Sequence, residues 1–319
     1  MYDNRSSFMH VLGIDAGGTK TVCLLANAEG EILAESRGGG ANLQASGELE
    51  VEKVLHGVME DAIGDRDVRP DAVCLGIAGV DRPADAEAVR GIMRRLGFKS
   101  RTLIVNDALV ALVAGVGDNP GVVLVAGTGS IAYGRDASGR AARSGGWGYM
   151  LGDEGGGFWI GRSALAAVVR QFDGRGPATM LTDLVLAEMR LASPTELIHA
   201  IYDKGLQRRA IAGIAAVVQR ASDAGDAMAS EILTRAGAEL TAAAASVIGR
   251  LGMRGDVFRT LLAGGIFHAI PALVADVQTR LSDVAPRSET QRLDVEPAVG
   301  AVRLALAAAH GTVKVPAYI

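Results

Sequence analysis

The sequence predicts an α/β protein made of two lobes, each a mixed β-sheet covered by helices. A chain of 319 residues is longer than one compact core normally accommodates. Strand-like apolar runs alternate with helical patterns over most of the length, which favours largely parallel, covered sheets. Two glycine-rich turns with hydroxyl residues, turn one at 15–19 and turn two at 127–130, each join two strand-like runs. This repetition indicates two related halves.

The first lobe is expected to open with a β-meander and to continue with alternating helices and strands. Apolar runs bounded by turn residues predict the strands, and apolar residues at helical spacing predict the helices. The unbroken apolar run at 72–77 suits a strand buried on both faces. In chain order the expected elements are strands 10–14, 20–28 and 32–36, a helix near 49–62, strand 72–77, helix 84–96, strand 102–105 and helix 108–116.

The second lobe is expected to repeat the meander and to add a long helical region. The segment 117–121 holds the densest turn chemistry, so we place the boundary there and expect lobes at 1–118 and 119–319. Whether the last helix packs back on the first lobe is left open. The expected elements are strands 122–126, 131–135 and 141–144, helices within 158–252, strands 258–262 and 292–295, and a last helix near 297–309.

Charge, apolar runs and cysteine positions indicate what kind of partner the protein binds and where in the cell it is expected. The formal net charge is -4 with 21% charged residues, so we expect a small-molecule partner rather than nucleic acid or a membrane. No apolar run approaches the ~20 residues of a membrane span, and the start lacks a signal-peptide pattern, which predicts a cytoplasmic protein. Cys23 and Cys74 lie in apolar runs and are expected to be small buried side chains.

The two turns are typical of loops that hold a nucleotide triphosphate. Glycines let backbone N–H groups converge on phosphate oxygens, because no Cβ blocks the approach and a positive φ costs little. Two other phosphate motifs do not fit. A P-loop needs lysine where Thr19 stands, followed by a helix. The dinucleotide fingerprint matches 127–132 loosely, but it must open a helix, and a strand is expected there.

The two turns, Asn106 and Asp107 at a strand end, and a late glycine pair together resemble the actin-like superfamily of sugar kinases, Hsp70 and actin. The resemblance spans almost the whole chain and implies two actin-like, ribonuclease H-like lobes with the active site in the cleft between them. It implies that turn one holds the β- and γ-phosphates of ATP with Mg²⁺, that turn two holds the other phosphates, and that the glycine pair lies against adenosine. These roles fall on Asp15, Gly17, Gly18, Thr19, Gly127, Thr128, Gly129, Ser130, Gly264 and Gly265.

Within this superfamily the chain resembles the N-acetylglucosamine kinase branch, which also contains glucosamine kinases and the BadF/BadG/BcrA/BcrD-type ATPases. The matching segments are 144–148 (Ser-Gly-Gly-Trp-Gly) and 151–156 (Leu-Gly-Asp-Glu-Gly-Gly). The implied activity is ATP-dependent phosphorylation of the 6-hydroxyl of an amino sugar, first of all N-acetylglucosamine, by a homodimer.

Three alternatives stay open at this point. The substrate can be glucosamine or N-acetylmuramic acid, the chain can be a BadF-type ATPase acting on a partner protein, or it can bind a sugar as a regulatory sensor without phosphorylating it. The BadF-type activators carry cysteines for an iron–sulfur cluster, and no cysteine follows Cys74 here, which argues against an activator.

Phosphoryl transfer needs a base near the acceptor hydroxyl and a cation near the phosphates. Asp107 is the expected catalytic base, although Asn106 and Asp107 are also common helix-capping residues. Asp15 is the expected carboxylate for Mg²⁺, usually through water. Trp147 is expected to cover the apolar face or acetamido methyl of the sugar, and Asp153 to bind its hydroxyls. The expected substrate-binding residues are Asn42, Asn106, Gly146, Trp147 and Asp153.

Overall fold

The computed structural model describes residues 9–43, 47–80, 82–203 and 207–319, and the chain forms two compact units. The first unit contains the chain up to Gly121, the segment Gly134–Ala141 and the C-terminal segment Leu293–Ile319. The second unit contains Val122–Tyr133 and Ala142–Arg292. Each unit is therefore discontinuous in sequence, and the last helix belongs to the first one.

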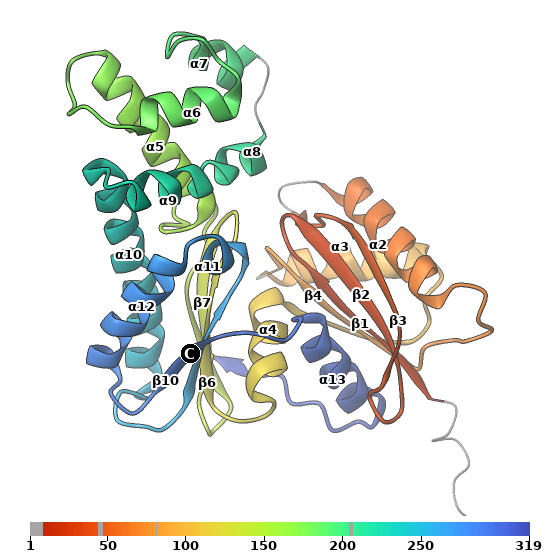
Figure 1. Cartoon of the computed structure of the whole chain (residues 1–319). Coiled ribbons are helices and arrows are strands. Elements are labelled where there is room, and N and C mark those ends of the chain that lie inside the picture. The colour runs from red at the N-terminus through yellow and green to blue at the C-terminus, as the bar shows by residue number, and fades with distance from the viewer. Residues whose placement is uncertain (1–8, 44–46, 81, 204–206) are drawn as a thin grey trace, which may run out of the picture. The chain divides into compact units, whose positions relative to one another are not determined.

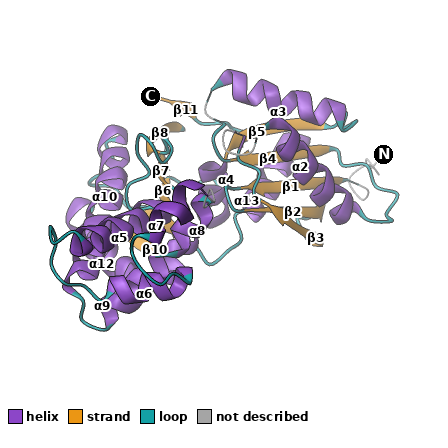
Figure 2. Cartoon of the chain, turned by 90° about the horizontal axis from the view of Figure 1, so that it is seen from above, coloured by secondary structure: helices purple, strands orange, loops and turns teal. Residues whose placement is uncertain are grey.

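The first unit is built on a five-stranded mixed sheet in the order β3-β2-β1-β4-β5 (Figure 2). The three N-terminal strands form the predicted antiparallel meander, and the other two run parallel to β1. All five expected strands are present, with ends shifted by a few residues at most. They are β1 (His10–Ala16), β2 (Lys20–Asn27), β3 (Ile32–Gly39), β4 (Ala72–Ile77) and β5 (Arg101–Asn106).

Helices cover both faces of this sheet: α2 (Glu48–Ile63) and α3 (Pro83–Arg95) on one, α4 (Asp107–Val116) and α13 (Ala298–Ala309) on the other (Figure 1). The helix α2 buries one apolar stripe against the sheet, as helical spacing predicts. On the opposite face two glycines permit close packing. A Cβ on Gly13 of β1 would collide with the backbone of α13, and one on Gly300 of α13 would collide with the backbone of α4.

The parallel strands place several expected site residues at one edge of the first sheet. Asp15 pairs with Gly76 across β1 and β4, and Ile77 pairs with Asn106 across β4 and β5. The carboxyl ends of the three parallel strands therefore lie side by side. In open α/β sheets this edge is where ligands bind.

The second sheet has six strands in the order β10-β9-β6-β7-β8-β11. One prediction is wrong here: the strand expected at 292–295 is β10 at Glu289–Arg292, which runs parallel to β9. Alternating apolar residues suggested the later segment, but the pairing partner decides where an edge strand lies. The short β11 was not expected. The strands are β6 (Gly121–Ala126), β7 (Ser130–Arg135), β8 (Arg140–Gly145), β9 (Arg259–Ala263), β10 and β11 (Ala317–Tyr318).

The expected helical region of the second unit consists of separate helices and a π-helical turn at His199–Asp203. They share an apolar core with α11 and α12 (Figure 1). None of the helices in the described part of the chain is long and apolar enough to cross a membrane. The helices are α5 (Gly157–Phe172), α6 (Leu181–Met189), α7 (Glu196–Ile198), α8 (Arg208–Gly213), α9 (Ala215–Asp223), α10 (Ala227–Leu251), α11 (Gly265–Ala269) and α12 (Pro271–Val284).

Cys23 in β2 and Cys74 in β4 are buried free thiols, as predicted. Burial raises the pKa of Cys23 to about 12 and raises the pKa of Cys74 as well. Both side chains therefore serve as small apolar residues of the first core.

Candidate active site

Turn one is shorter than the sequence indicated. Asp15 and Ala16 pair with β2 as the last residues of β1, so only 17–19 leave the ladder. The Gly17 N–H donates to the Lys20 carbonyl over 3.0 Å, and the Gly17 carbonyl accepts from the Ala41 N–H over 3.0 Å. The turn is thus closed by its own backbone and fastened to the chain that follows β3.

Glycine in turn one provides space rather than an unusual dihedral angle. Gly17 and Gly18 both have negative φ, so of the two properties of glycine only the missing Cβ is used there. A Cβ on Gly18 would meet nothing within 4 Å, whereas one on Gly40 would collide with the Gly18 carbonyl. The turn is therefore backed by a second glycine and is open on its outer side.

Asp15 lies under this turn and is electrostatically unusual. The residue is only 8% exposed, and its pKa is raised to about 8. Burial is the largest cause, the negative charges of Asp107 and Glu296 add to it, and the positive charge of Lys20 acts against them. Asp15 and Asp107 are thus close enough to repel each other, and the local positive charge does not compensate. A cation bound beside Asp15 would relieve this repulsion.

The sequence suggested both Asn106 and Asp107 as capping residues of the following helix, and the structure shows that Asn106 is the cap. The Asn106 side chain accepts a hydrogen bond from the Ala108 N–H over 2.8 Å and so caps α4. Asp107 is the first residue of α4 and is partly exposed. The capping function therefore belongs to Asn106, and the Asp107 carboxylate lies at the carboxyl edge of the sheet near Asp15. Asn42 also belongs to this region, since it follows Ala41, which bonds to turn one.

Turn two is held by the protein through all four of its carbonyl groups. The Gly127 carbonyl accepts from the Gly157 N–H over 2.8 Å, and the Thr128 carbonyl accepts from the Phe158 N–H over 2.9 Å. The Gly129 carbonyl accepts from the Gly127 N–H over 2.9 Å, and the Ser130 carbonyl from the Gly146 N–H over 2.9 Å. Each carbonyl group of the turn therefore already accepts one protein N–H, which favours an anion over a cation as the ligand of this turn.

Asp153 connects turn two to the segment expected to bind sugar. Its carboxylate accepts from the Gly148 N–H over 3.3 Å and from the Ser130 N–H, and a Cβ on Gly129 would collide with it. Burial raises the pKa of Asp153, against the effect of these hydrogen bonds. Its φ of 60° is rare for a residue other than glycine. This strained backbone holds the carboxylate against turn two, an arrangement common at functional sites.

Ser130 has both of its donors engaged by the same segment. Its hydroxyl donates to the Glu154 carbonyl over 2.7 Å, and its N–H is bonded to Asp153. Ser130 therefore fixes the geometry of turn two, and the sequence offered no signal for this linkage.

The late glycine pair lies beside the start of turn two. Gly264 has a φ of 101°, and a Cβ there would collide with the backbone of Ala126, the residue before Gly127. Gly265 is the first residue of α11. The second unit thus brings the residues expected to contact adenosine next to those expected to contact phosphate.

Trp147 is exposed and is covered on one side by an arginine. The residue is 65% exposed, and the Arg143 guanidinium lies 4.9 Å from the centre of its ring. Arg143 also donates to the Gly145 carbonyl over 3.1 Å, which fixes the guanidinium there. Gly146 has a φ of 71° and packs on Ile131. Arg143 therefore lies over the Trp147 ring and beside Gly146.

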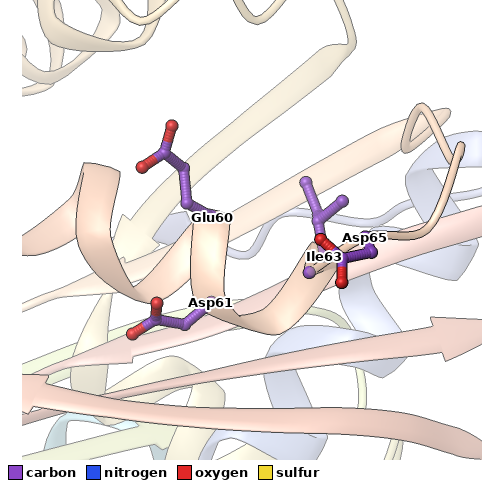
Figure 3. A pocket seen from close by; sticks show the side chains of 5 residues that line it. Glu60, Asp61, Ile63 and Asp65 are labelled. Atoms are coloured by element: carbon purple, nitrogen blue, oxygen red, sulfur yellow. The ribbon is translucent and has the colours of Figure 1, made fainter.

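Other features lie outside this set. The hollow at the end of α2, about 580 Å³, is lined by three acidic residues, Ile63 and Gly64, and contains none of the expected site residues (Figure 3). Among the residues that the structure describes, no three histidine, cysteine, aspartate or glutamate side chains gather as a complete metal site. Mg²⁺ commonly keeps water and phosphate oxygens as ligands, so it can bind beside a single carboxylate.

Comparison with known proteins extends over nearly the whole chain. The model of the BadF/BadG/BcrA/BcrD ATPase family matches residues 12–305. An N-acetylmuramic acid/N-acetylglucosamine kinase from Clostridium acetobutylicum is 35% identical over 299 residues, which are 93% of this chain and 98% of the relative. An N-acetyl-D-glucosamine kinase from Dictyostelium discoideum is 32% identical over 309 residues, 92% of this chain and 97% of the relative.

A solved structure confirms the fold. A protein of Chromobacterium violaceum, provisionally assigned as an N-acetylglucosamine kinase, superposes with a TM-score of 0.77 at 24% identity. The match covers 94% of this chain and 99% of the other. The predicted fold of two mixed sheets covered by helices, of the actin-like sugar kinase type, is therefore correct.

Proposed function

Because the chain belongs to the BadF/BadG/BcrA/BcrD ATPase family, we propose that it transfers the γ-phosphoryl group of ATP to the 6-hydroxyl of an amino sugar, N-acetylglucosamine in the first place. The observation that carries the proposal is turn two, whose four carbonyl groups all accept from protein N–H groups and leave a loop suited to phosphate. The two relatives described above, from Clostridium acetobutylicum and Dictyostelium discoideum, have N-acetylglucosamine kinase in their names.

Asp107 acts as the base that takes the proton from the sugar hydroxyl. It stands at the carboxyl edge of the first sheet, and Asn106 supplies the helix cap, so the Asp107 carboxylate is not needed there. Its negative charge contributes to the raised pKa of Asp15. Phosphoryl transfer depends mainly on positioning of the reactants and on charge neutralisation, and less on covalent chemistry of the protein. A single carboxylate next to the sugar hydroxyl is therefore sufficient as the base.

The residues of turn one fit a magnesium ion. Asp15 is a buried carboxylate with an excess of neighbouring negative charge, and it would hold Mg²⁺ directly or through water. When bound, Mg²⁺ neutralises the charge that develops on the phosphates. Gly17, Gly18 and Thr19 offer backbone groups beside it, and Asn42 lies next to the turn for contact with the sugar.

The second unit supplies the remaining contacts. Turn two and the glycine pair bind the nucleotide, while Gly146, Trp147 and Asp153 bind the sugar. The exposed Trp147 ring offers an apolar face of the kind that covers a sugar ring or an acetamido methyl. Asp153 joins both functions, because its carboxylate is bonded to turn two.

Two other substrates and one other activity are candidates. N-acetylmuramic acid is favoured as a second substrate because the relative from Clostridium acetobutylicum is named for both sugars. Glucosamine and a BadF-type ATPase activity on a partner protein stay further alternatives. The homodimer and the cytoplasmic location also stay predictions.

The test is sugar-dependent release of ADP from ATP and Mg²⁺, with the product analysed for a 6-phosphate. We expect N-acetylglucosamine to raise ADP release by about two orders of magnitude or more, since water is a poor competitor in a kinase site. N-acetylmuramic acid, glucosamine and N-acetylmannosamine complete the panel, and Asp107→Asn is the inactive control. Equal ADP release without any sugar would support the ATPase alternative, and sugar binding without a phosphorylated product would support a sensor.

A further inference from the structure

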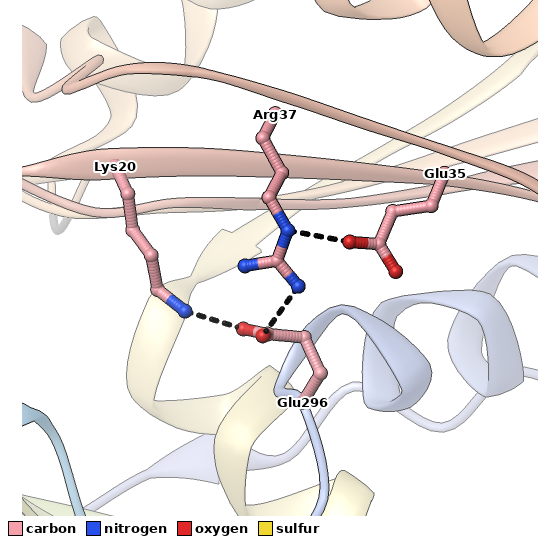
Figure 4. Close-up of polar contacts among 4 residues, drawn as sticks. All are labelled: Lys20, Glu35, Arg37 and Glu296. Carbon is pink, nitrogen blue, oxygen red and sulfur yellow. Dashed lines mark hydrogen bonds and ion pairs between the residues drawn. The ribbon is translucent and has the colours of Figure 1, made fainter.

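Lys20 follows turn one directly and is held in a defined position. It is the first residue of β2, and its Nζ lies 2.7 Å from Oε1 of Glu296 (Figure 4). Its side chain is 53% exposed, so it remains accessible to a ligand. The pair joins positions 276 residues apart in the sequence, both in the first unit.

Glu296 is itself fixed from two sides. Its other oxygen lies 3.3 Å from Nη2 of Arg37 on β3, and Arg37 also pairs with Glu35 (Figure 4). The Glu296 carbonyl accepts from the Val299 N–H in the turn that starts α13, and α13 packs tightly on β1. The carboxylate therefore holds the Lys20 ammonium beside turn one instead of letting it range over the surface.

Next to this ammonium, turn one has a backbone N–H that can donate a hydrogen bond to an anion. The Gly18 N–H has no hydrogen-bond partner among the described residues, and the space beyond Gly18 is open. The charge of Lys20 also reaches Asp15, whose pKa it lowers. A compact ammonium beside an open backbone N–H is a suitable pair of donors for a phosphate oxygen.

We propose that Lys20 is a phosphate-binding residue of turn one, and that its ammonium exchanges the Glu296 carboxylate for an oxygen of the terminal phosphates of ATP. While no nucleotide is bound, the Glu296 carboxylate holds the Lys20 ammonium beside turn one. When nucleotide binds, the carboxylate competes with phosphate for the ammonium. The proposal rests on the proposed function only in taking ATP as the ligand, and it does not depend on the sugar.

The test is calorimetric binding of a non-hydrolysable ATP analogue and of adenosine, with Mg²⁺ and without sugar. Lys20→Met should weaken binding of the analogue about tenfold or more, as expected for a lost charge-assisted contact, and leave adenosine unchanged. Glu296→Gln should tighten binding of the analogue a few-fold, because it removes a competitor and a repelling charge. Lys53→Met, an exposed lysine on α2 in the same unit, is the matched control and should change neither.

The opposite signs of the two variants separate this role from a structural one. If Lys20 and Glu296 only brace the fold, both variants weaken the analogue and adenosine together, and the proposal is wrong. Unchanged affinity of Lys20→Met for the analogue also overturns it. Nucleotide binding with these signs but without sugar phosphorylation would leave this proposal intact and remove the proposed kinase function. A wild-type protein that binds no analogue would overturn both.

Discussion

The two glycine turns have similar sequences but are held in different ways. Turn one is surrounded by charge: Asp15 below it, Asp107 near it, and Lys20 paired with Glu296 beside it. Turn two is held by neutral hydrogen bonds, since each of its carbonyl groups accepts from a backbone N–H. The Asp153 carboxylate at turn two also serves as a hydrogen-bond acceptor for backbone groups.

This difference indicates a division of tasks between the turns. A preorganised neutral loop binds phosphate with little reorganisation, because its dipoles already point the right way. A loop among uncompensated charges responds strongly to a cation or a phosphate, because each added charge changes the local balance. We therefore expect turn two to be the more rigid of the two proposed phosphate loops, and turn one to be the electrostatically sensitive one. The following changes test this contrast.

The largest effect is expected from Asp107→Asn at the charged side. The amide cannot accept the proton of the sugar hydroxyl, so kcat should fall by about 10²–10⁴ while sugar affinity changes little. Steady-state kinetics with calorimetric sugar binding measures both. Near-normal kcat would remove Asp107 from its catalytic role, and loss of sugar binding would make it a substrate contact instead.

The second prediction concerns the free energy of unfolding of Asp15→Asn as a function of pH, measured in EDTA by urea titration. The folded-state pKa of Asp15, about 8, lies above its ordinary value of 3.8, so its ionisation destabilises the fold. This destabilisation is absent below the unfolded pKa, grows as pH rises between the two values, and is complete above pH 8. Asp15→Asn should therefore be more stable than wild type by up to roughly 5 kcal/mol near pH 8.5, with the difference vanishing toward pH 4.

Asp226 provides the control of opposite sign. Burial opposes its ionisation, but hydrogen bonds from the Ala229 N–H, the Met180 N–H and the Thr179 hydroxyl outweigh this effect and lower its pKa. Its stabilising contribution is present above the unfolded pKa and is lost as pH falls through the folded pKa. Asp226→Asn should therefore destabilise at neutral pH and converge with wild type in acid. A pH-independent difference for Asp15→Asn would contradict the charged character of turn one.

Substitution of single glycines compares the packing of the two turns. Gly129→Ala puts a Cβ into the Asp153 carboxylate and should destabilise the protein by about 1–3 kcal/mol and weaken ATP binding. Gly18→Ala meets open space and should leave stability nearly unchanged. Thermal unfolding and nucleotide titration of both variants give the comparison. Adding Asp153→Gly to Gly129→Ala should restore part of the lost stability, and failure of this rescue would show that the collision is not the cause.

The smallest effect is expected from substitution of Trp147, the exposed side chain that we propose binds the sugar. Trp147→Ala should raise KM for N-acetylglucosamine about tenfold with little change in KM for ATP or in thermal stability, because the ring is largely exposed. Phe172→Ala, an exposed aromatic residue on α5, is the matched control and should change none of these. An unchanged sugar KM for Trp147→Ala would leave the ring without a role in binding.

Most of the secondary structure followed from local patterns. Apolar periodicity located α2, β4 and α4 to within one or two residues, because each presents its pattern within a single window of the chain. The strand β10 was misplaced because an edge strand of mixed polarity carries little periodic signal. The residues of the two turns were visible because glycine and hydroxyl residues cluster only where the backbone must approach something closely.

The sequence by itself determined the two turns, the order of the elements, and a helix start at Asn106 and Asp107. These depend on neighbours within a few residues, where propensity and spacing act. Only the tertiary structure placed Glu296 on Lys20, Asp153 on Gly129, and the last helix against β1 through Gly13. Those contacts join residues distant in the chain, and they arise from packing and from the pairing of charges that burial would otherwise leave uncompensated.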